Sequence, residues 1–353
     1  MAARTVLVCE AQVPFVEGGA ERLVRQLVHH LREHGYRAEL VAIPFKWYPK
    51  QEILAHAAAW RLLDLSESNG QAVDLVIATK FPSYFVRHPD KVTWLVHQYR
   101  AAYELCGTPF SDFEYTELDV GLRETLLTLD RQMLLESRRL FTISRTISGR
   151  LKKYLGIHAE PLYHPPRLAP SLRQGAFGDY VLSVGRIESI KRVDLAVAAL
   201  AHTRSPLRLV VVGEGTQREN VMRAAERAGV ADRVDFLGAV DDERLCALYA
   251  GSLAVVYAPY DEDYGYVTLE AFLSGKPVIT ARDSGGTLEF VEDCVNGRVC
   301  EPTPDAIGAA MNDLAASRRL AASYGDAGLA RACTITWHGV IESLVSSQEP
   351  VGP

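Results

Sequence analysis

The sequence predicts an α/β protein made of two Rossmann-like domains, each built on a parallel sheet. Short β-branched runs alternate with amphipathic helical stretches along the whole 353-residue chain, which is the pattern of repeated βαβ units. A proline-rich break near the middle divides this alternation into two series. A chain of this length is also longer than one hydrophobic core normally accommodates, so two domains are expected.

The first series occupies residues 1–165. Its helical patterns include Ala20–His34, which Gly35 stops, and Gly121–Ser137. Its expected strands are Thr5–Cys9, Ala38–Ile43, Val73–Thr79, Val92–His97 and Leu140–Ile143. These strands are apolar on successive residues rather than on alternate ones, as expected when helices cover both faces of a parallel sheet.

The break lies in the stretch 159–178, which holds four prolines and has little periodicity, so residues 166–178 are expected to link the domains. A second series follows over residues 179–333. Its expected strands, each followed by a helix, are Tyr180–Val184, Leu207–Val212, Val234–Leu237, Leu253–Tyr257 and Pro277–Thr280. The end of the chain, residues 334–353, is expected to form one more amphipathic helix and a tail. That helix either caps the second domain or crosses back to the first.

Composition and charge argue against several classes of protein. The net charge of −6 argues against nucleic acid as the main partner. No segment reaches the roughly 18–20 uninterrupted apolar residues that a membrane span requires, and no signal-peptide core precedes the first strand. The six cysteines are scattered, without a CxxC pair or a histidine at zinc-ligand spacing. We therefore expect a cytoplasmic protein with free thiols and no structural zinc.

Ligands of such sheets bind beyond the carboxyl ends of the strands, so functional residues are expected in the loops that follow strands. In the first domain, Gly18 and Gly19 end the loop Glu10–Gly19 and open a helix. Paired glycines let the backbone approach a ligand closely, and the helix N-terminus offers amides to an anion, although an ordinary tight turn would look the same. His97 ends a strand and could contact a sugar hydroxyl, although a lone histidine is usually structural.

In the second domain, Arg186 and Lys191 follow a strand end and precede a helix. Two cations at this place could clamp a diphosphate, the alternative being a solvated charged loop. The next strand runs into a glycine-rich turn that contains Gly213 and Glu214. This turn lacks the full GxGxxG spacing and a later acidic residue, so it predicts a loop that supports nucleotide binding rather than an NAD site.

The segment Pro259–Pro277 carries the strongest pattern. Glu262 and Glu270 are separated by seven residues, and the expected loop-to-helix junction lies between them, so Glu262 is expected in the loop and Glu270 in the first helical turn. Carboxylates can accept hydrogen bonds from the vicinal hydroxyls of a sugar and of a ribose, and helix amides at Thr268 and Leu269 can meet a phosphate between them. The residues expected to touch a donor here are Asp263, Tyr264, Gly265, Tyr266, Val267, Thr268, Leu269 and Glu270.

The acidic residues of this segment also fit two simpler roles, and both stay open. Acidic residues commonly stabilise a helix N-terminus, which would account for Glu270 but less well for the cluster 261–263. Asp261 and Asp263 also spell a DxD pattern that could hold a metal ion on a diphosphate. Arg186 and Lys191 already supply cations for the same purpose, so no metal site is expected.

Taken together, these loops resemble the GT-B glycosyltransferases of family GT4 over nearly the whole chain. The matching elements, in order, are GG-x-E-R at Gly18–Arg22, GR-x4-K at Gly185–Lys191, GEG at Gly213–Gly215, E-x7-E at Glu262–Glu270, the run Ser284–Glu289, and Asn296-Gly297. The resemblance implies two domains that face each other across a deep cleft. The first would bind the acceptor, the second would bind a nucleotide-sugar, and the C-terminal helix would return to the first.

By the same resemblance the chain would be a retaining, metal-independent hexosyltransferase that requires no cofactor. His97, Arg186, Lys191 and Glu262 would form its catalytic group: the two cations would neutralise the diphosphate, Glu262 would bind the donor-sugar hydroxyls, and His97 would bond the donor near its C6 hydroxyl. Fixed cations and helix termini aimed at a departing diphosphate can replace a divalent ion. A phosphate oxygen of the leaving group would then accept the proton of the acceptor.

The resemblance also assigns Gly18 and Gly19 to the donor phosphates or sugar, and Glu270 to the ribose diol. The family often carries Phe before the glycine of this segment, whereas this chain has Tyr264, which would alter the sugar contacts.

The donor and the acceptor are predicted less sharply. GDP-mannose is the first expectation, because residues 262–279 are similar to mannosyltransferase versions of this helix, and UDP- and dTDP-sugars follow. The acceptor would be a saccharide, a lipid-linked molecule or a natural product, with Tyr99–Glu117 shaping its pocket. Peripheral membrane contact, suggested by the basic stretches 23–37 and 150–154, and the oligomeric state stay open.

Two alternatives to sugar transfer are a nucleotide-sugar 2-epimerase of the same fold and a non-catalytic protein that binds sugar nucleotides. The epimerase would need acid and base groups at the sugar C2, and no such set is identifiable in the sequence.

Overall fold

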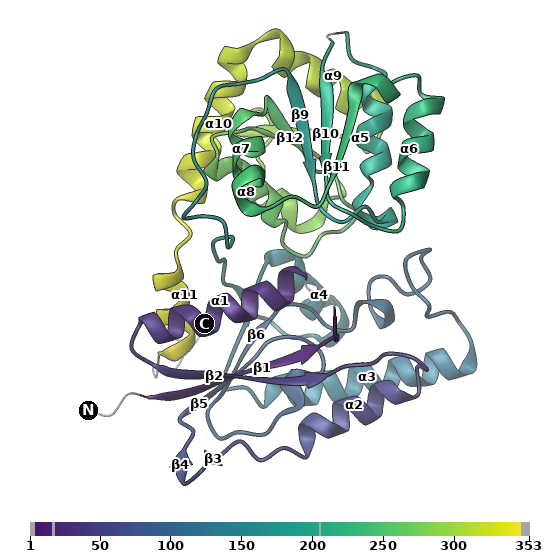
Figure 1. The fold of residues 1–353 in the computed structure, drawn as a ribbon. Coiled ribbons are helices and arrows are strands. Elements are labelled where there is room, and N and C mark those ends of the chain that lie inside the picture. The colour runs from purple at the N-terminus through teal and green to yellow at the C-terminus, as the bar shows by residue number, and fades with distance from the viewer. Residues whose placement is uncertain (1–3, 16–17, 205, 347–353) are drawn as a thin grey trace. The chain divides into compact units, whose positions relative to one another are not determined.

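The computed structural model describes residues 4–15, 18–204 and 206–346 and divides the chain into two compact units (Figure 1). The first unit contains the chain up to His164 together with the segment from Thr336 onward, and the second contains Pro165–Ile335. Residues 16 and 17 of the expected glycine loop, and residues 347–353 of the expected tail, lie outside the described residues.

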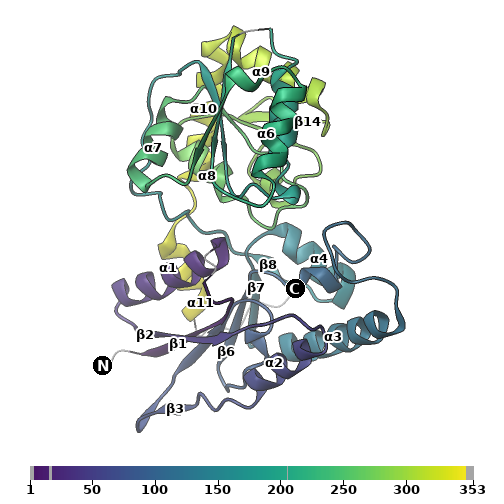
Figure 2. The same ribbon diagram turned by 45° about the vertical axis from the view of Figure 1, so that its right-hand side comes forward.

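The first unit is built on a six-stranded parallel sheet with the strand order β2-β1-β5-β6-β7-β8 (Figure 2). Its strands are β1 (Thr5–Gln12), β2 (Arg37–Pro44), β5 (Leu75–Ala78), β6 (Lys91–Leu95), β7 (Arg139–Thr142) and β8 (Glu160–Pro161). Its helices are α1 (Gly19–Glu33), α2 (Glu52–Arg61), α3 (Glu117–Leu135), α4 (Arg145–Leu155) and α11 (Trp337–Val345). A short antiparallel ribbon, β3 (Glu67–Ser68) with β4 (Gln71–Ala72), lies outside this sheet.

The second unit repeats the architecture with the strand order β11-β10-β9-β12-β13-β14, again all parallel. Its strands are β9 (Tyr180–Val184), β10 (Arg208–Val212), β11 (Val234–Gly238), β12 (Ala254–Val256), β13 (Val278–Ala281) and β14 (Gly297–Cys300). Its helices are α5 (Val193–Leu200), α6 (Arg218–Arg227), α7 (Asp242–Gly251), α8 (Tyr266–Leu273), α9 (Pro304–Ala316) and α10 (Arg318–Ala332). Both units therefore have the predicted Rossmann-like organisation.

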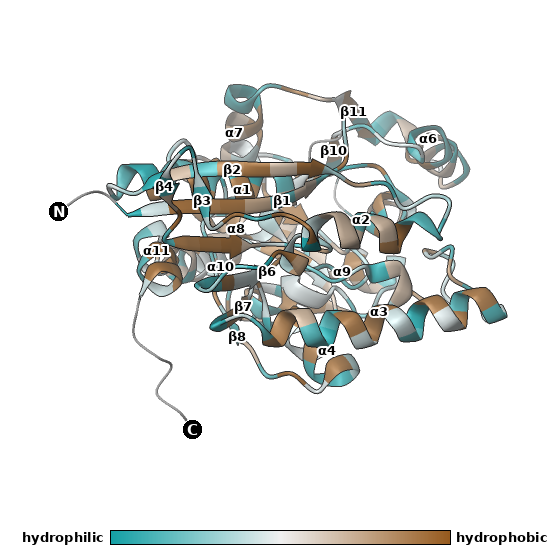
Figure 3. Cartoon of the chain, turned by 90° about the horizontal axis from the view of Figure 1, so that it is seen from below, coloured by the Kyte–Doolittle hydropathy of each residue, from teal (hydrophilic) through white to brown (hydrophobic). Residues whose placement is uncertain are grey.

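The strands form where the sequence is apolar on consecutive residues. Every residue of β5, β12 and β13 is buried, which is the expected state of a parallel strand with helices on both faces of its sheet. Figure 3 shows the apolar colour on β1 and β2 and an alternation of apolar and polar residues along α3. An amphipathic helix of this kind buries one stripe against the sheet.

The C-terminal helix α11 belongs to the first unit, as the resemblance implied. The indole of Trp337 stacks on the His30 ring of α1 with the ring centroids 4.6 Å apart. Arg4 donates a hydrogen bond to the carbonyl of Val345 at 2.8 Å, and Arg138 donates one to Ser346 at 3.0 Å. The alternative position, as a cap on the second unit, is therefore wrong.

The structure differs from the expected elements in a few places. The run Val92–His97 forms a strand only as far as Leu95, and residues 166–178, expected as a linker, pack on the second unit. There the buried Lys276 donates a hydrogen bond to the carbonyl of Gly175 at 2.7 Å. Within the described residues, no helix has the length and apolar character needed to cross a membrane.

Candidate functional site

The strand order of the second sheet reverses at β9, which lies between β10 and β12. At such a switch point the connections leave the sheet on opposite faces, so a crevice opens beyond the carboxyl ends of the two strands. The loop after β9 spans Gly185–Arg192, and the loop after β12 spans Tyr257–Gly265. The sequence-predicted residues Arg186, Lys191 and Glu262 therefore meet at one edge of the second sheet.

Lys191 and Glu262 form an ion pair between these two loops, and each side chain is 18% exposed. The ammonium is predicted to bind a diphosphate and the carboxylate to bind a sugar, so the two groups expected to share one ligand already lie in contact. The nearby Arg186 side chain is exposed. Among the residues that the structure describes, its guanidinium has no hydrogen bond or ion pair.

The glycine-rich turn after β10 supports the loop after β9. Gly213 has a φ of +130°, and a Cβ atom at this position would lie 2.0 Å from the carbonyl oxygen of Gly185. The amide of Ile187 donates to the carbonyl of Glu214 at 2.9 Å, which joins the two loops. The Glu214 side chain points to solvent, where its carboxylate lies 3.7 Å from Arg218. In the structure, the backbone of this turn thus packs closely against the backbone of the loop after β9.

Arg192, which no sequence pattern singled out, fixes the loop after β12. Its guanidinium donates hydrogen bonds to the carbonyls of Ala258 and Pro259, both at 2.8 Å, and forms two bonds of 2.6 and 2.9 Å with Asp283. A bidentate arginine–carboxylate pair holds its geometry more tightly than a lysine contact would. Nothing in the sequence distinguishes Arg192 from its neighbour Lys191, which pairs with Glu262 instead.

Gly285 and Gly286 hold the acidic loop from the other side. A Cβ atom at Gly285 would lie 2.5 Å from the carbonyl oxygen of Glu262, and one at Gly286 would lie 2.6 Å from that of Asp263. The amide of Gly286 donates to the carbonyl of Glu262 at 2.7 Å. Two glycines are needed here because the backbones of the loops after β12 and β13 are in direct contact.

Helix α8 begins at Tyr266, directly after Gly265, whose φ is +87°. Glu270 is therefore its fifth residue and lies in the second turn, so its predicted place in the first turn is wrong. The Thr268 amide, one of the two expected to meet a phosphate, donates to the carbonyl of Gly265 at 3.0 Å in this structure. Tyr264, Val267 and Leu269 are buried here.

Two buried tyrosines hold the two glutamates. The Tyr249 hydroxyl donates a hydrogen bond to Glu270 at 2.7 Å, and burial together with the Glu270 charge raises the pKa of Tyr249 well above its ordinary value. Burial, the charge of Glu262 and a hydrogen bond to it likewise raise the pKa of Tyr257. Both phenols consequently stay protonated and act only as donors toward the carboxylates. Tyrosines buried in an apolar run give no sequence signal for this role.

Two buried hydroxyls lie beside Gly265 at the start of α8. Thr268 and Thr287 are fully buried, and within the described residues neither Oγ1 has a hydrogen-bond partner. A buried hydroxyl without a partner is costly, and the N-terminus of a helix favours negative charge. The edge around Gly265 is therefore suited to a ligand that brings acceptor oxygens, such as a phosphate.

The first unit contains the remaining predicted residues, described here within that unit. The amide of Gly18 donates to the Glu21 carboxylate at 2.8 Å, and Glu21 forms a buried ion pair with Lys80. Glu21, the glutamate that follows the Gly18-Gly19 pair, thus fixes the turn before α1. His97 lies just beyond the carboxyl end of β6, and its Nδ1 is 2.7 Å from the carbonyl oxygen of Gln98.

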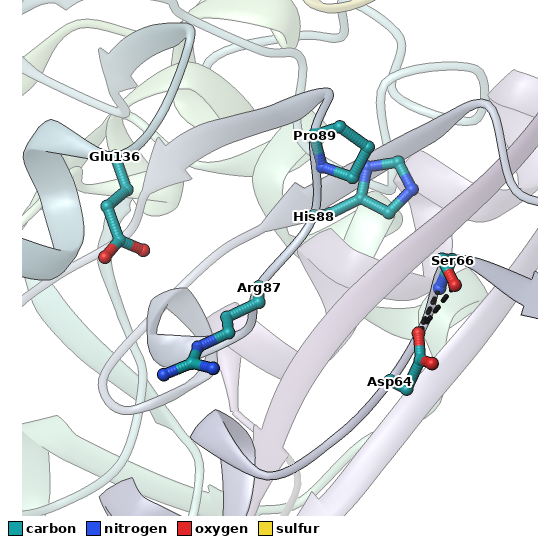
Figure 4. Close-up of a pocket in the computed structure, with 6 residues that line it drawn as sticks. All are labelled: Asp64, Ser66, Arg87, His88, Pro89 and Glu136. Carbon is teal, nitrogen blue, oxygen red and sulfur yellow. Dashed lines mark hydrogen bonds between the residues drawn. The ribbon is translucent and has the colours of Figure 1, made fainter.

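A surface pocket of the first unit is lined by none of the predicted residues (Figure 4). It is found where β6 begins and α3 ends, at the amino edge of the sheet. The residues that line it are Asp64, Ser66, Arg87, His88, Pro89 and Glu136. Within it, Asp64 accepts hydrogen bonds from Ser66, and Glu136 pairs with Arg61 at 2.6 Å, so both carboxylates of the pocket are engaged in the protein.

Residues 176–331 match the family described as glycosyl transferases group 1. The chain is 30% identical over 241 residues to D-inositol 3-phosphate glycosyltransferase of Segniliparus rotundus, a match that covers 61% of this chain and 53% of that protein. It is 33% identical over 167 residues to human alpha-1,3/1,6-mannosyltransferase ALG2, covering 43% of this chain and 40% of that protein. The chain thus spans about half, or less, of the curated relatives it matches.

Solved structures resemble the fold over almost the whole chain. Sucrose-phosphate synthase from Thermosynechococcus elongatus superposes with a TM-score of 0.76 at 19% identity and covers 96% of this chain and 97% of its own. The Anabaena protein HepE, solved in complex with UDP and glucose, gives a TM-score of 0.68 at 18% identity, with 94% and 95% covered. With a GT-B fold and a family match that coincides with the loops described above, residues 176–331 form a domain of the group 1 glycosyltransferase family.

Proposed function

We propose that this protein is a retaining glycosyltransferase that binds a nucleotide-sugar at the carboxyl edge of its second sheet and transfers the hexose without a metal ion. The observation that carries the proposal is the meeting of Lys191 and Glu262 at the switch point, next to the exposed Arg186. One edge thus offers cations for a diphosphate and a carboxylate for sugar hydroxyls. The family match over residues 176–331 supports the same activity.

In this proposal, the charged residues bind different parts of the donor. The Arg186 guanidinium is exposed and would take the first phosphate contacts. Lys191 would exchange its bond to Glu262 for one to the diphosphate, which frees the carboxylate to accept hydrogen bonds from the sugar. Cations held on short loops in this way stabilise the charge that develops on the leaving diphosphate.

Glu270 would hold the ribose diol. Its side chain is held by Tyr249, whose hydroxyl donates a hydrogen bond to the carboxylate at 2.7 Å, and a carboxylate can accept bonds from several donors at once. Glu262 and Glu270 would then serve as donor-binding groups rather than as the acid and nucleophile of a glycosidase. In the proposed transfer, the acceptor hydroxyl attacks the anomeric carbon, the bond to the diphosphate breaks, and a phosphate oxygen of the leaving group takes the proton.

GDP-mannose is the donor that we propose first, followed by UDP- and dTDP-sugars. A relative named as a mannosyltransferase supports mannose, and a structural neighbour solved with UDP and glucose supports the second choice. The acceptor that we propose is a saccharide, a lipid-linked molecule or a small hydroxylated molecule, such as the inositol phosphate named for another relative.

Nucleoside diphosphate release from GDP-, UDP- and dTDP-sugars, with and without a panel of hydroxylated acceptors, tests the activity. The expected result is release that depends on the acceptor, a product with the anomeric configuration of the donor, and turnover that persists in EDTA. Failure of every nucleotide to raise the melting temperature, together with no release from any donor, would refute the proposal. An isomerised donor formed without acceptor would favour the epimerase instead.

Two variants separate the roles of the glutamates. Glu262→Gln should weaken binding of the nucleotide-sugar while leaving that of the free nucleoside diphosphate nearly unchanged. Glu270→Gln should weaken both about equally. Glu301→Gln is the control, because Glu301, like Glu262, forms an ion pair (with Arg282, at 2.6 Å) but lies on the exposed surface of the same unit. Equal effects of the first two variants on both ligands would contradict the assigned contacts.

A further inference from the structure

Helices α1 and α11 lie side by side within the first unit (Figures 1 and 2). Two histidines face each other where α1 ends and α11 begins. His34 follows the last residue of α1, and His338 is the second residue of α11. Their ring centroids are 5.6 Å apart, and the ring planes are inclined to each other by 23°. Nε2 of His34 lies 3.4 Å from Nδ1 of His338.

The surroundings of the two rings decide where their protons lie. Nδ1 of His34 is 2.7 Å from the carbonyl oxygen of His30, and a carbonyl only accepts, so this nitrogen carries the proton. Nε2 of His338 is 3.2 Å from a carboxylate oxygen of Glu342. Nε2 of His34 therefore presents its lone pair to Nδ1 of His338, and the two nitrogens are in hydrogen-bond contact at 3.4 Å. A metal ion bound by both nitrogens would take the place of the proton between them.

The spacing fits a tetrahedral metal ion. Two imidazole nitrogens that each bind zinc at about 2.0–2.1 Å are about 3.3–3.4 Å apart when the angle at the metal is tetrahedral. The nitrogens of His34 and His338 are already at this separation. In addition, each ring is oriented through its other nitrogen by a carbonyl or a carboxylate, which is the usual arrangement around metal-binding histidines.

The electrostatics around the pair also favour a dication. The C-terminus of a helix carries partial negative charge, and His34 is the capping residue at the end of α1. The carboxylates of Glu33 and Glu342 belong to the same two helices. Glu33 lies 3.2 Å from Nε2 of His29 and 2.7 Å from Nδ1 of His30, so the end of α1 carries three more groups of the metal-ligand type.

We propose that His34 and His338 bind a divalent transition-metal ion of the zinc class, which links the end of α1 to the start of α11. Imidazole nitrogen suits zinc, nickel, cobalt and copper, whereas magnesium and calcium prefer oxygen. Two protein ligands leave coordination positions for water, and the His338 side chain is 68% exposed, so the ion has access to the site. The effect of such an ion is structural: it holds the C-terminal helix on the first unit.

The test uses the full chain without a histidine tag, stripped of metal with a chelator. Titration with Zn²⁺ by calorimetry, and with Co²⁺ by visible absorption, should show binding that is lost in both His34→Gln and His338→Gln. His158→Gln is the matched control, because His158 is an exposed histidine of the same unit and should leave binding unchanged. Hydrogen exchange of α11 should slow on adding Zn²⁺ in the parent chain but not in His338→Gln.

Two outcomes would overturn this proposal. Zn²⁺ binding that survives His338→Gln but not His29→Gln would place the ion on α1 alone, with Glu33. No binding of Zn²⁺ or Co²⁺ up to millimolar concentration would leave the facing nitrogens to share a proton instead. Since His34 and His338 are exposed, unchanged circular dichroism of the metal-free variants shows that any lost binding is not caused by unfolding.

Discussion

The Glu270 carboxylate receives a hydrogen bond of 2.7 Å from Tyr249, a residue that is fully buried at the end of α7. Tyr249 makes no contact with solvent, so water cannot replace Glu270 as the acceptor of its hydrogen bond. The bond is kept only while the carboxylate stays in place. A buried phenol with a raised pKa cannot lose its proton near neutral pH, and its role as donor is fixed. At the scale of one residue, Tyr249 is therefore a positioning group for Glu270.

Tyr249→Phe should weaken binding of the donor nucleotide about fivefold to tenfold, because Glu270 loses the bond that orients it, a loss of about 1–1.4 kcal/mol. Isothermal titration with nucleoside diphosphate measures the effect. Tyr180→Phe is the matched control, since it removes a phenol bond of 2.6 Å to the carbonyl of Leu248 in the same unit. Equal weakening in both variants would show that lost packing, not the orientation of Glu270, is responsible.

Asp130 is a second residue whose environment makes a measurable prediction. Burial raises the pKa of its carboxyl to about 7, against a hydrogen bond from Tyr103 of 2.6 Å that lowers it. An unfolded aspartate titrates near pH 3.9, so between about pH 4 and 7 the folded state holds a proton that the unfolded state has lost. The contribution of Asp130 to stability is therefore fully present below about pH 4 and falls as the pH rises toward 7.

Asp130→Asn should remove this dependence. As the pH rises from about 4 to 7, the free energy of unfolding of the variant should increase relative to that of the parent chain, by at most about 1.4 kcal/mol per pH unit. Chemical denaturation of both chains at several pH values gives the difference. The asparagine amide changes the free energy of unfolding by the same amount at every pH. The measured quantity is therefore the slope of this free energy against pH and not its absolute value. Parallel curves for the two chains would contradict the raised pKa of Asp130.

At the scale of elements, the loop Tyr257–Gly265 has no regular secondary structure, yet it carries the predicted sugar-binding carboxylate. Its position comes from its neighbours: Arg192 bonds two of its carbonyls, and Gly286 bonds a third. The loop is thus as fixed as the strand ends from which those neighbours extend. A preorganised site needs this support, because misplacement of a binding group by about 1 Å is enough to lose most of its effect.

Gly286→Ala tests this support. Its methyl group would lie 2.6 Å from the carbonyl oxygen of Asp263, so the acidic loop has to move. We expect about 1–3 kcal/mol of destabilisation and a loss of donor affinity of at least about tenfold. Gly121→Ala is the control, because a methyl group there meets nothing within 4 Å in helix α3, and it should stabilise the chain by about 0.5–1 kcal/mol. Unchanged donor affinity in Gly286→Ala would show that the loop tolerates displacement.

The sequence predicts elements well where one physical signal dominates. Apolar runs located most central strands, and strand ends located Arg186, Lys191 and Glu262. It could not locate β14 (Gly297–Cys300), because that edge strand is only partly buried and has no apolar run. Contacts between distant backbones, such as Gly286 with Asp263, depend on how loops fold over each other, and no local pattern records them. Arg192 is such a case, since its four bonds reach 66 to 91 residues along the chain.

At the scale of the whole molecule, the chain leaves its first unit at His164 and returns to it at Thr336. The apolar face of α11, with Val340, Ile341 and Leu344, would suit either unit, so the sequence alone left its place open. Trp337 decides the matter in the structure. Its indole contacts His30, Trp94 and His164, which come from α1, β6 and the end of the first unit.

Trp337→Ala should therefore destabilise the first unit and leave the second intact. Truncation of a buried tryptophan costs about 3–5 kcal/mol, and because Trp337 is only partly buried we expect about 2–3 kcal/mol. Hydrogen exchange should rise in α1 and α11 but not in β9 or β12. The affinity for nucleoside diphosphate should stay unchanged, since Arg186, Lys191 and Glu270, which are proposed to bind the diphosphate and the ribose, belong to the second unit. Lost nucleotide binding in a variant that keeps the protection of β9 and β12 would mean that residues of the first unit contribute to it.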